Sequence, residues 1–227
     1  MARLTFHGQS TFTIETDDGT RLVIDPFFDD NPVSDIKRAE VGAVDYILCT
    51  HGHFDHFVDA IPLARETGAT LISTFEIVSF AETQGVQGHP LHIGGGYDFP
   101  FGRVKMTPAI HGGQVHGDTT GQFTTVPGGF LLHIDGKRIY HAGDTALTVD
   151  MQLLRGKVDV AILPIGDNFT MGPEDAATAV GFIEPGVVIP VHYNTWPLIE
   201  QDPEHFRALV GDRARVQVVA PGEAYAP

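Results

Sequence analysis

The chain has 227 residues, and its 42% content of hydrophobic residues fits a single globular domain over residues 1–227 with a sizeable buried core. Its 14 Lys and Arg residues against 29 Asp and Glu residues give a net charge of -15, which repels phosphate backbones, so we expect no nucleic-acid partner. The only cysteine, Cys49, excludes an intramolecular disulfide and fits a reducing compartment. Because no signal peptide or apolar membrane span is visible, we predict a cytoplasmic protein without a membrane partner.

The first part of the chain alternates between predicted strands and helices. Phe12 and Ile14 alternate with polar residues, and turn-forming residues follow them, which predicts a hairpin of strands 12–15 and 21–24. The apolar run 44–49 predicts a buried strand. The next predicted elements are a helix over 58–67, a strand over 69–72 and a helix over 75–84. This order is typical of helices packed outside a sheet.

The second part continues the same alternation. Residues 112–129 are rich in Gly, Thr and Gln and poor in large apolar side chains, so we expect a mobile surface loop that covers the substrate. The apolar run 158–163 echoes residues 44–48, and a polar loop follows both. The remaining predicted elements are a strand over 103–110, a hairpin of 130–134 and 137–140, a helix over 148–155, a helix from Pro173, a strand over 186–191, a helix around 207–210 and a strand over 216–219.

Three histidines and an aspartate stand within residues 51–56, directly after a predicted strand. We expect them in the loop at the carboxyl end of that strand, where open α/β sheets place their sites. Alternate residues of an extended loop can point at one ion, so His51 and His53 are predicted to share a metal ion. Asp55 and His56 are left for a second ion nearby. Imidazole and carboxylate ligands suit zinc, manganese and iron.

Three further candidates come off the ends of predicted strands. His111 is the first choice for the third ligand of the first ion, and His116 in the same loop is its competitor. His192 follows the last buried strand. Asp144 lies in a glycine-bearing turn, where the two oxygens of its carboxylate suit a bridge between two cations. The alternative for Asp144 is an N-cap of the helix that follows.

These motifs together resemble the metallo-β-lactamase superfamily, most closely its metal-dependent hydrolase branch, which is related to ascorbate-phosphate lactonase and N-acyl-phosphatidylethanolamine phospholipase D. The resemblance covers nearly the whole chain. It implies an α/β fold, namely a four-layer αββα sandwich of two mixed sheets with outer helices. The motifs that carry it are Phe6-His7-Gly8, Ile24-Asp25-Pro26-Phe27, the cluster at 51–56, Tyr140-His141-Ala142-Gly143-Asp144-Thr145, Pro164 to Gly172 and Pro190-Val191-His192-Tyr193-Asn194-Thr195.

The resemblance also implies roles for individual residues. Asp144 bridges the ions, and His192 completes the second ion together with Asp55 and His56. Asp25 lies beneath the metals and orients a ligating histidine, although it otherwise reads as a turn cap.

The position of His7 in relatives lies close to the metals, so His7 is expected near them or facing the substrate. Gln9 stands where relatives often have a second histidine, which changes any contribution from that position. Polar residues in two later strand-end loops are candidates to bind substrate oxygens, with a purely structural loop as the alternative. These residues are Asn168, Thr170 and Asn194.

The predicted ligand set is large enough for two divalent ions with positions left open for water and substrate. Two ions roughly 3.5–4 Å apart lower the pKa of a bound water from 15.7 toward about 7, and Asp55 is the catalytic candidate that orients the water or carries a proton. We therefore predict a metal-dependent hydrolase that uses a hydroxide bound to a binuclear metal site to cleave a small-molecule ester, lactone or phosphoester.

Alternatives stay open for the metal, the oligomeric state and the function. Zinc is the preferred metal, with manganese or iron as alternatives, and a homo-oligomer is left open. The alternative functions are a non-catalytic metal-binding protein and a flavodiiron-like oxidoreductase on the same fold.

Overall fold

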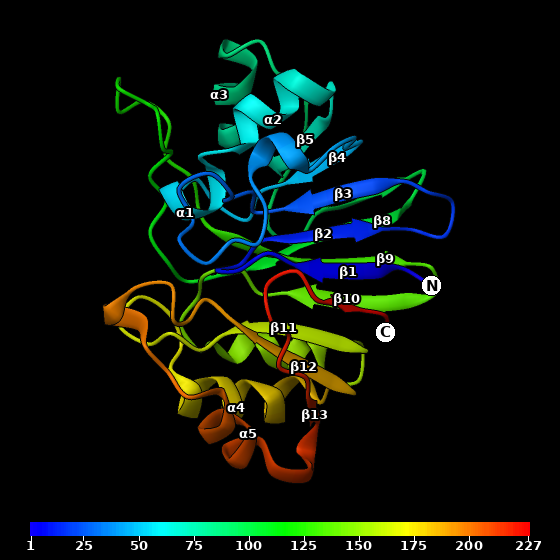
Figure 1. The fold of residues 1–227 in the computed structure, drawn as a ribbon, viewed down its shortest axis with the longest axis vertical. Coiled ribbons are helices and arrows are strands. Elements are labelled where there is room, and N and C mark those ends of the chain that lie inside the picture. The colour runs from blue at the N-terminus through cyan, green and yellow to red at the C-terminus, as the bar shows by residue number, and fades with distance from the viewer.

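All residues, 1–227, are described by a computed structural model in which two seven-stranded sheets pack face to face (Figure 1). The first sheet contains, in spatial order, β14 (Ala224–Tyr225), β1 (Arg3–Phe6), β2 (Phe12–Glu15), β3 (Arg21–Ile24), β4 (Tyr46–Leu48), β5 (Thr70–Thr74) and β6 (Gly88–Leu91). The second contains β13 (Arg215–Val216), β12 (Val187–Val191), β11 (Val160–Pro164), β10 (Lys137–His141), β9 (Gly128–Ile134), β8 (Gly102–Pro108) and β7 (Gly96–Phe99).

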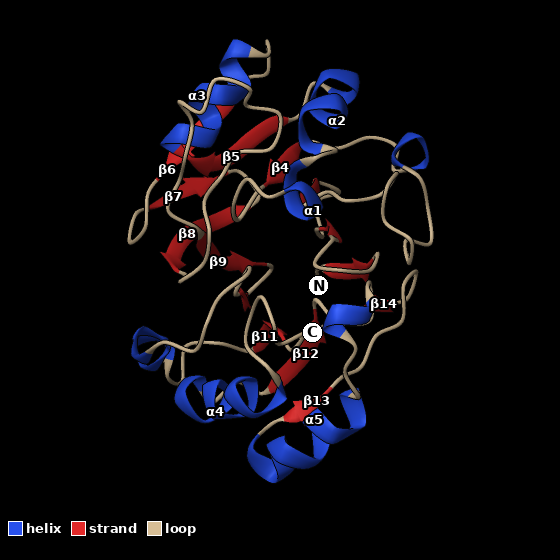
Figure 2. Cartoon of the chain, turned by 90° about the vertical axis from the view of Figure 1, so that its left-hand side faces the viewer, coloured by secondary structure: helices blue, strands red, loops and turns tan.

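Helices cover the outer faces of both sheets (Figure 2). The first sheet carries α1 (Phe54–Phe57), α2 (Ala60–Thr67) and α3 (Phe75–Thr83), and the second carries α4 (Pro173–Ile183) and α5 (Pro203–Val210). Short 3-10 helices are η1 (Arg38–Glu40), η2 (Val149–Leu154), η3 (Pro197–Ile199) and η4 (Gly211–Arg213). This arrangement is the predicted four-layer αββα sandwich, which is confirmed. No helix has the length and apolar character that a membrane span requires.

The two sheets are built on the same plan. In each, antiparallel pairing runs through four strands and parallel pairing through the last four, so β4 and β11 are the first strands added in parallel. The echo between residues 44–48 and 158–163 therefore falls on equivalent strands of the two halves. Both predicted hairpins, β2 with β3 and β9 with β10, are present.

Three apolar layers hold the sandwich together. The inward-facing side chains of both sheets form a central core of 22 buried residues, among them Phe12, Ile24 and Phe130. The opposite faces of the same strands pack on the helices, with α1 to α3 on one side and α4 and α5 on the other. Strands buried on both faces read as continuous apolar runs, and this is why residues 44–49 and 158–163 were recognisable in the sequence.

The carboxyl ends of β1, β3, β4, β8, β10, β11 and β12 meet at one edge of the sandwich, on the left in Figure 1. This follows from the pairing, because strands that are parallel, or separated by one antiparallel neighbour, run in the same direction. Each loop that leaves these ends therefore reaches the same region, and we call this region the strand-end edge.

Several predicted elements differ in the structure. Residues 54–57 form α1 instead of continuing the loop, and the predicted helix over 148–155 is the 3-10 helix η2, capped by Thr148, whose hydroxyl accepts a hydrogen bond from the Asp150 backbone. The predicted strand 216–219 is only Arg215–Val216. Strands β6, β7 and β14 had no counterpart in the predictions.

Candidate metal centre

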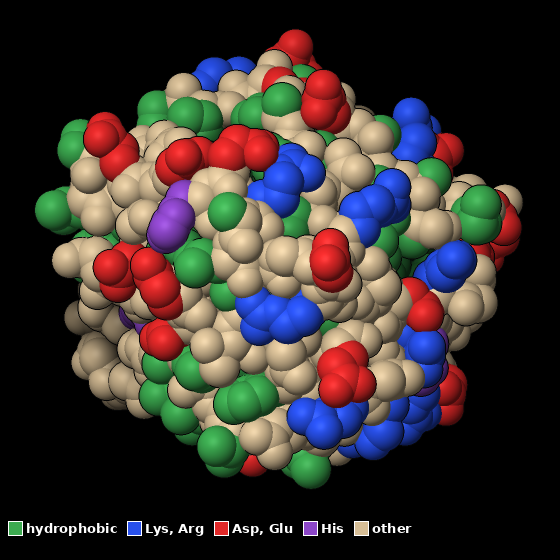
Figure 3. Space-filling model, turned by 90° about the horizontal axis from the view of Figure 1, so that it is seen from below, with side chains coloured by type: hydrophobic (Ala, Val, Ile, Leu, Met, Phe, Trp, Pro, Cys, Tyr) green, Lys and Arg blue, Asp and Glu red, His purple; other side chains and the backbone are tan.

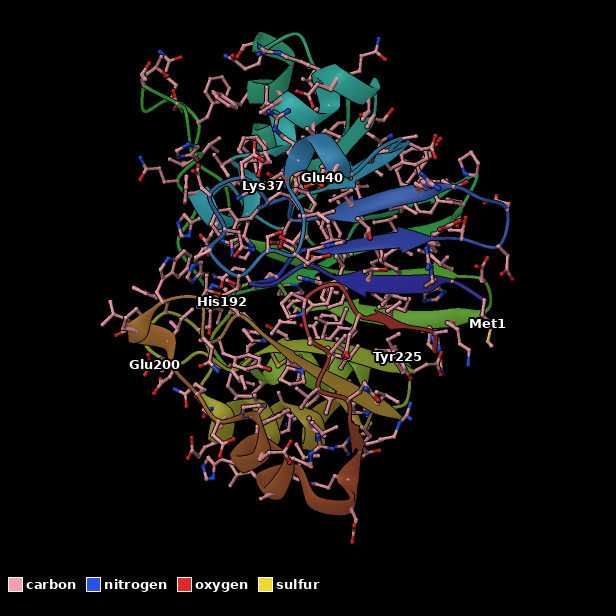
Figure 4. The ribbon with its side chains drawn as sticks, viewed as in Figure 1. Met1, Lys37, Glu40, His192, Glu200 and Tyr225 are labelled. Atoms are coloured by element: carbon pink, nitrogen blue, oxygen red, sulfur yellow. The ribbon has the colours of Figure 1, made fainter.

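Seven of the predicted ligands converge at the strand-end edge as two neighbouring groups. The ligand atoms within each group lie within 4.8 Å of one another. The first group is His51, His53 and His111, and the second is Asp55, His56, Asp144 and His192. Figure 4 shows the labelled His192 among the loops of this edge.

Asp144 lies between the two groups. Its Oδ2 atom is 3.5 Å from His111 Nε2 and 4.0 Å from His51 Nε2 in the first group, and 3.0 Å from His192 Nε2 in the second. Its Oδ1 atom is 3.3 Å from His56 Nε2. Within the first group, His53 Nδ1 and His111 Nε2 are 3.1 Å apart. The carboxylate of Asp144 is therefore in reach of ions held by either group.

The local backbone explains how such distant residues meet. His53 precedes α1 in an extended conformation, and α1 then turns Asp55 and His56 toward the second group. His192 follows β12 with a φ of 56°, a left-handed conformation that is uncommon outside glycine. A side chain at Gly166 would place its Cβ 2.2 Å from the His192 carbonyl oxygen, so only glycine permits this approach.

Asp25 fixes the orientation of two histidines. Its Oδ2 accepts a hydrogen bond from His56 Nδ1 at 2.8 Å and another from the Thr50 hydroxyl at 2.7 Å. Because that hydroxyl donates to Asp25, it accepts from His51 Nδ1, which is 3.0 Å away. Both rings then carry a proton on Nδ1, and the Nε2 atoms of His51 and His56 face the cluster.

The histidines of the two groups differ in charge. Burial lowers the pKa of His51, His53 and His111, so these rings are neutral near pH 7. Burial acts in the same direction on His56 and His192, but the carboxylates of Asp144 and Asp55 outweigh it. They hold the pKa of His56 well above its ordinary value and raise that of His192 to about 9.

The two carboxylates respond in the opposite sense. Burial alone would raise the pKa of both carboxyl groups, but the positive charges of His56 and His192 beside them hold the pKa of Asp55 and Asp144 far below the ordinary range. Both side chains are therefore ionised at neutral pH and present oxygens that only accept.

This asymmetry predicts proton release from one group only. In protein stripped of metal by a chelator, His56 and His192 are protonated at pH 7, so filling the second group with Zn²⁺ is expected to release about two protons, and filling the first group none. Titration calorimetry in two buffers of different ionisation enthalpy measures this number. The pairing of protonated His192 with Asp144 and Asp55 also stabilises the stripped protein. Because the pKa of His192 rises from its ordinary value of 6.5 to about 9 in the folded protein, this stabilisation is complete below pH 6.5 and is lost as the pH rises through about 9. Equal proton release from both groups would contradict the assignment.

The donor set fits divalent cations. His51 Nε2, His56 Nε2 and Asp144 Oδ1 are buried without a hydrogen-bond partner, and an unsatisfied buried polar atom costs about 1–3 kcal/mol. All three atoms lie on the side of their residues that faces the cluster. Cations held by the two groups would satisfy all three atoms, and nitrogen with carboxylate oxygen is a donor set for zinc, manganese or iron.

Other predicted residues lie elsewhere. The structure does not bring His7 to the cluster: its Nδ1 is 2.7 Å from Asp35 Oδ1 and its Nε2 is 2.9 Å from Thr13 Oγ1. Successive side chains of β1 point to opposite faces of the sheet, and this alternation continues into His7 and places its ring on the outer face. His116 is exposed and its ring packs on Phe54 at 5.1 Å, so His111 and not His116 joins the first group.

The three candidate substrate-binding residues make no contact with the cluster in the structure. Asn168 is exposed with a φ of 47°. The Thr170 hydroxyl donates to the Met171 carbonyl at 3.2 Å, and Asn194 Oδ1 accepts from the Gln201 backbone at 2.8 Å. Thr170 and Asn194 thus hold their own loops in shape.

Gln9 contacts the cluster although it was not among the predicted site residues. It is 1% exposed, its Nε2 donates to Asp55 Oδ2 at 2.7 Å, and its Oε1 accepts from the Thr195 hydroxyl. A carboxylate only accepts, so the amide nitrogen has to face Asp55. The Gln9 carbonyl also accepts from the His192 backbone at 2.7 Å. The available signal was its position, two residues after His7 at a strand end.

Replacing Gln9 is expected to weaken the second ion selectively. Gln9→Met keeps the volume but removes the donor to Asp55, and we expect about 10- to 100-fold weaker Zn²⁺ binding at the second group with the first group unchanged, as for other residues that orient ligands. Gln9→Glu adds a carboxylate beside Asp55 and should be worse. Two-site titration against a chelating dye measures both affinities, and the exposed Gln122→Met is the matched control. Equal loss at both groups would count against this role.

The fold and the donor cluster define a metal-dependent hydrolase of the metallo-β-lactamase fold, and comparison with known proteins agrees. Residues 3–192 match the family model described as a beta-lactamase superfamily domain. The chain belongs to the beta-lactamase superfamily. The predicted family and the predicted class, metal-dependent hydrolase, are confirmed.

Similar proteins extend over nearly the entire chain. It is 49% identical to a UPF0173 metal-dependent hydrolase of Heliobacterium modesticaldum, over 98% of this chain and 96% of the relative. It is 48% identical to a UPF0173 metal-dependent hydrolase of Anoxybacillus flavithermus, over 94% and 96%. Among solved structures, Igni18, a metallo hydrolase of the archaeon Ignicoccus hospitalis, superposes with a TM-score of 0.89 at 37% identity, covering 99% of this chain and 97% of that chain.

Proposed function

We propose that this hydrolase binds two divalent metal ions and cleaves a small ester, lactone or phosphoester. The observation that carries the proposal is the position of Asp144, whose two carboxylate oxygens lie within 4.0 Å of histidine nitrogens in both groups. His51, His53 and His111 would hold the first ion, and Asp55, His56 and His192 the second. Relatives that are 48–49% identical are named hydrolases, which favours this function over a non-catalytic metal-binding protein or an oxidoreductase.

The residues of the chain have separable tasks in this proposal. Bound ions would supply Lewis acidity and a water that ionises near neutral pH. Asp25 and Thr50 set the tautomers of His56 and His51, and Gln9 holds one oxygen of Asp55. With the second ion bound, its positive charge would keep Asp55 ionised, so the carboxylate could orient the attacking water by accepting its hydrogen bond or carry a proton to the leaving group.

Further features of the proposal rest on composition and chemistry. Zinc is our first choice because its borderline softness suits a histidine-rich set, with manganese and iron as alternatives. The net charge of -15 favours a neutral or small anionic substrate, held directly at the metals, over nucleic acid. The single cysteine, buried and free, is consistent with a cytoplasmic location.

Metal analysis combined with a substrate screen tests the function. Elemental analysis of the purified protein is expected to find two zinc, manganese or iron ions per chain. Hydrolysis of bis-p-nitrophenyl phosphate, lactones and p-nitrophenyl esters should be lost with chelator and regained with metal. Two bound ions with no turnover of any of these substrates would favour the non-catalytic metal-binding protein instead.

A further inference from the structure

Large apolar side chains are exposed around the proposed metal site. Ten large hydrophobic side chains are exposed in the whole molecule, and they include five on segments of the strand-end edge. We call these five the apolar rim: Phe54 (39% exposed), Ile110 (59%), Val126 (64%), Phe169 (51%) and Leu198 (68%). Figure 2 looks onto this edge, and in Figure 3 hydrophobic side chains project at the left, the side on which the edge lies.

Two members of the rim are direct neighbours of proposed ligands. Phe54 stands between His53 and Asp55, and Ile110 precedes His111. Their backbones are therefore placed by the same segments that place the proposed ligands, so both residues stand beside the proposed metal site.

The other members are tied to the site by backbone hydrogen bonds. Met171 donates to Thr145, next to Asp144, at 2.9 Å, which anchors the loop of Phe169. Gly128 donates to Thr50 at 3.1 Å, two residues after Val126. Asn194 donates to Ile199 at 2.9 Å and closes the turn that carries Leu198.

The rim is supported from beneath. Phe27 packs edge-on against Phe54 with 5.4 Å between ring centroids, and against Trp196 at 6.1 Å, which links α1 to the segment before η3. Phe27 itself is fully buried. This packing holds the ring of Phe54 in place, and exposed apolar side chains gathered beside a polar site mark binding surfaces.

The rim contains no positive charge. The segments 53–57, 110–127, 167–171 and 194–199 contain no Lys or Arg, and Lys and Arg gather toward the right in Figure 3, away from this edge. An anionic membrane surface would meet a protein of net charge -15 with no compensating Lys or Arg in these segments. An aliphatic group of a single dissolved molecule needs none.

We propose that the apolar rim binds an aliphatic chain of the substrate, so that the substrate is an ester, lactone or phosphoester with an alkyl or acyl chain of several carbons. This inference rests on the proposed function for the position of the reacting group at the ions. This alkyl or acyl group lies across Phe54, Phe169 and Leu198 and contributes to binding through the apolar area that it buries.

Inert alkylphosphonates test the proposal without requiring turnover. Calorimetric titration of the Zn²⁺-loaded protein with methyl-, butyl- and octylphosphonate is expected to show Kd falling about three- to fourfold per added methylene, as expected for about 0.8 kcal/mol per buried CH₂. The double variant Phe169→Ser, Leu198→Ser should reduce this dependence to less than twofold per methylene while methylphosphonate still binds as before. The matched control, Tyr97→Ser with Leu153→Ser, changes side chains of similar exposure (49% and 69%) on β7 and η2 and should keep the full dependence.

The outcomes separate this inference from the proposed function. A Kd that does not depend on chain length, or an equal loss in the control variant, overturns the inference. Co-sedimentation with phosphatidylcholine vesicles that is lost in the rim variant would replace the dissolved substrate with a membrane surface and overturn it too. Absence of ester turnover would contradict only the proposed function, because phosphonate binding requires no hydrolysis.

Discussion

Replacing Asp144 by alanine is expected to weaken both metal ions and to lower kcat/KM by about 10³-fold or more. The carboxylate is 2% exposed and lies within 4.0 Å of ligand nitrogens in both groups. Without it, His56 and His192 lose the charge that raises their pKa, and each group keeps three donors. The second ion should be lost at micromolar protein, and the first should bind about 10- to 100-fold more weakly.

Variants of single ligands show whether an effect on both ions is specific to Asp144. His111→Ala should weaken the first ion and leave the second nearly unchanged, and His192→Ala should do the reverse, so only the Asp144 variant affects both. Two-site Zn²⁺ titrations and kcat/KM on the best ester from the screen measure these effects. Asp30→Ala is the control, since Asp30 is exposed and its side chain makes no hydrogen bond. Two ions bound with unchanged affinity in Asp144→Ala would refute the bridging role.

Much of the fold was predictable because strands buried on both faces leave long apolar runs. Residues 44–49 and 158–163 are of this kind, and both are central parallel strands. By contrast, β6 contains a glycine and a proline, and β14 has two residues whose strand character comes only from pairing with β1. Such strands form only by pairing with a strand that is distant in the sequence, so no local sequence pattern predicts them.

The candidate ligands were predictable for a related reason. A polar residue within three residues of the end of an apolar strand is placed at the strand-end edge by the strand itself, and this holds for His51, His111, Asp144 and His192. His7 satisfied the same rule, yet alternation turned its ring to the outer face. Gln9 reaches the cluster because its backbone adopts a φ of 55°. Neither outcome can be inferred from residue type, because each depends on the direction of one side chain.

Replacing Asp25 is expected to damage both folding stability and metal binding. Its carboxylate is fully buried and accepts hydrogen bonds from the Thr50 backbone at 2.7 Å, the Thr50 hydroxyl at 2.7 Å and His56 Nδ1 at 2.8 Å. Asp25→Ala leaves three buried donors unpaired at about 1–3 kcal/mol each and places alanine at a φ of 47°. We expect the free energy of unfolding to fall by about 3–5 kcal/mol and Tm by roughly 6–20 °C.

Asp25→Asn distinguishes the effect of losing the carboxylate from the effect of the left-handed backbone conformation. Asparagine tolerates the left-handed conformation, so the loss of stability should be smaller, while the single amide oxygen can serve only part of the donor set. His51 and His56 then lose their fixed tautomers, and Zn²⁺ affinity should fall about 10- to 100-fold at both groups even where the protein stays folded. Chemical denaturation and two-site Zn²⁺ titration measure the two effects independently.

Asp45→Ala is the matched control, because this exposed carboxylate also accepts from a backbone amide, at 2.8 Å from the Arg21 nitrogen, but lies away from the cluster. If Asp25→Asn bound both ions as tightly as the unchanged protein, the tautomers would have to be set by the metals themselves and not by the Asp25 network.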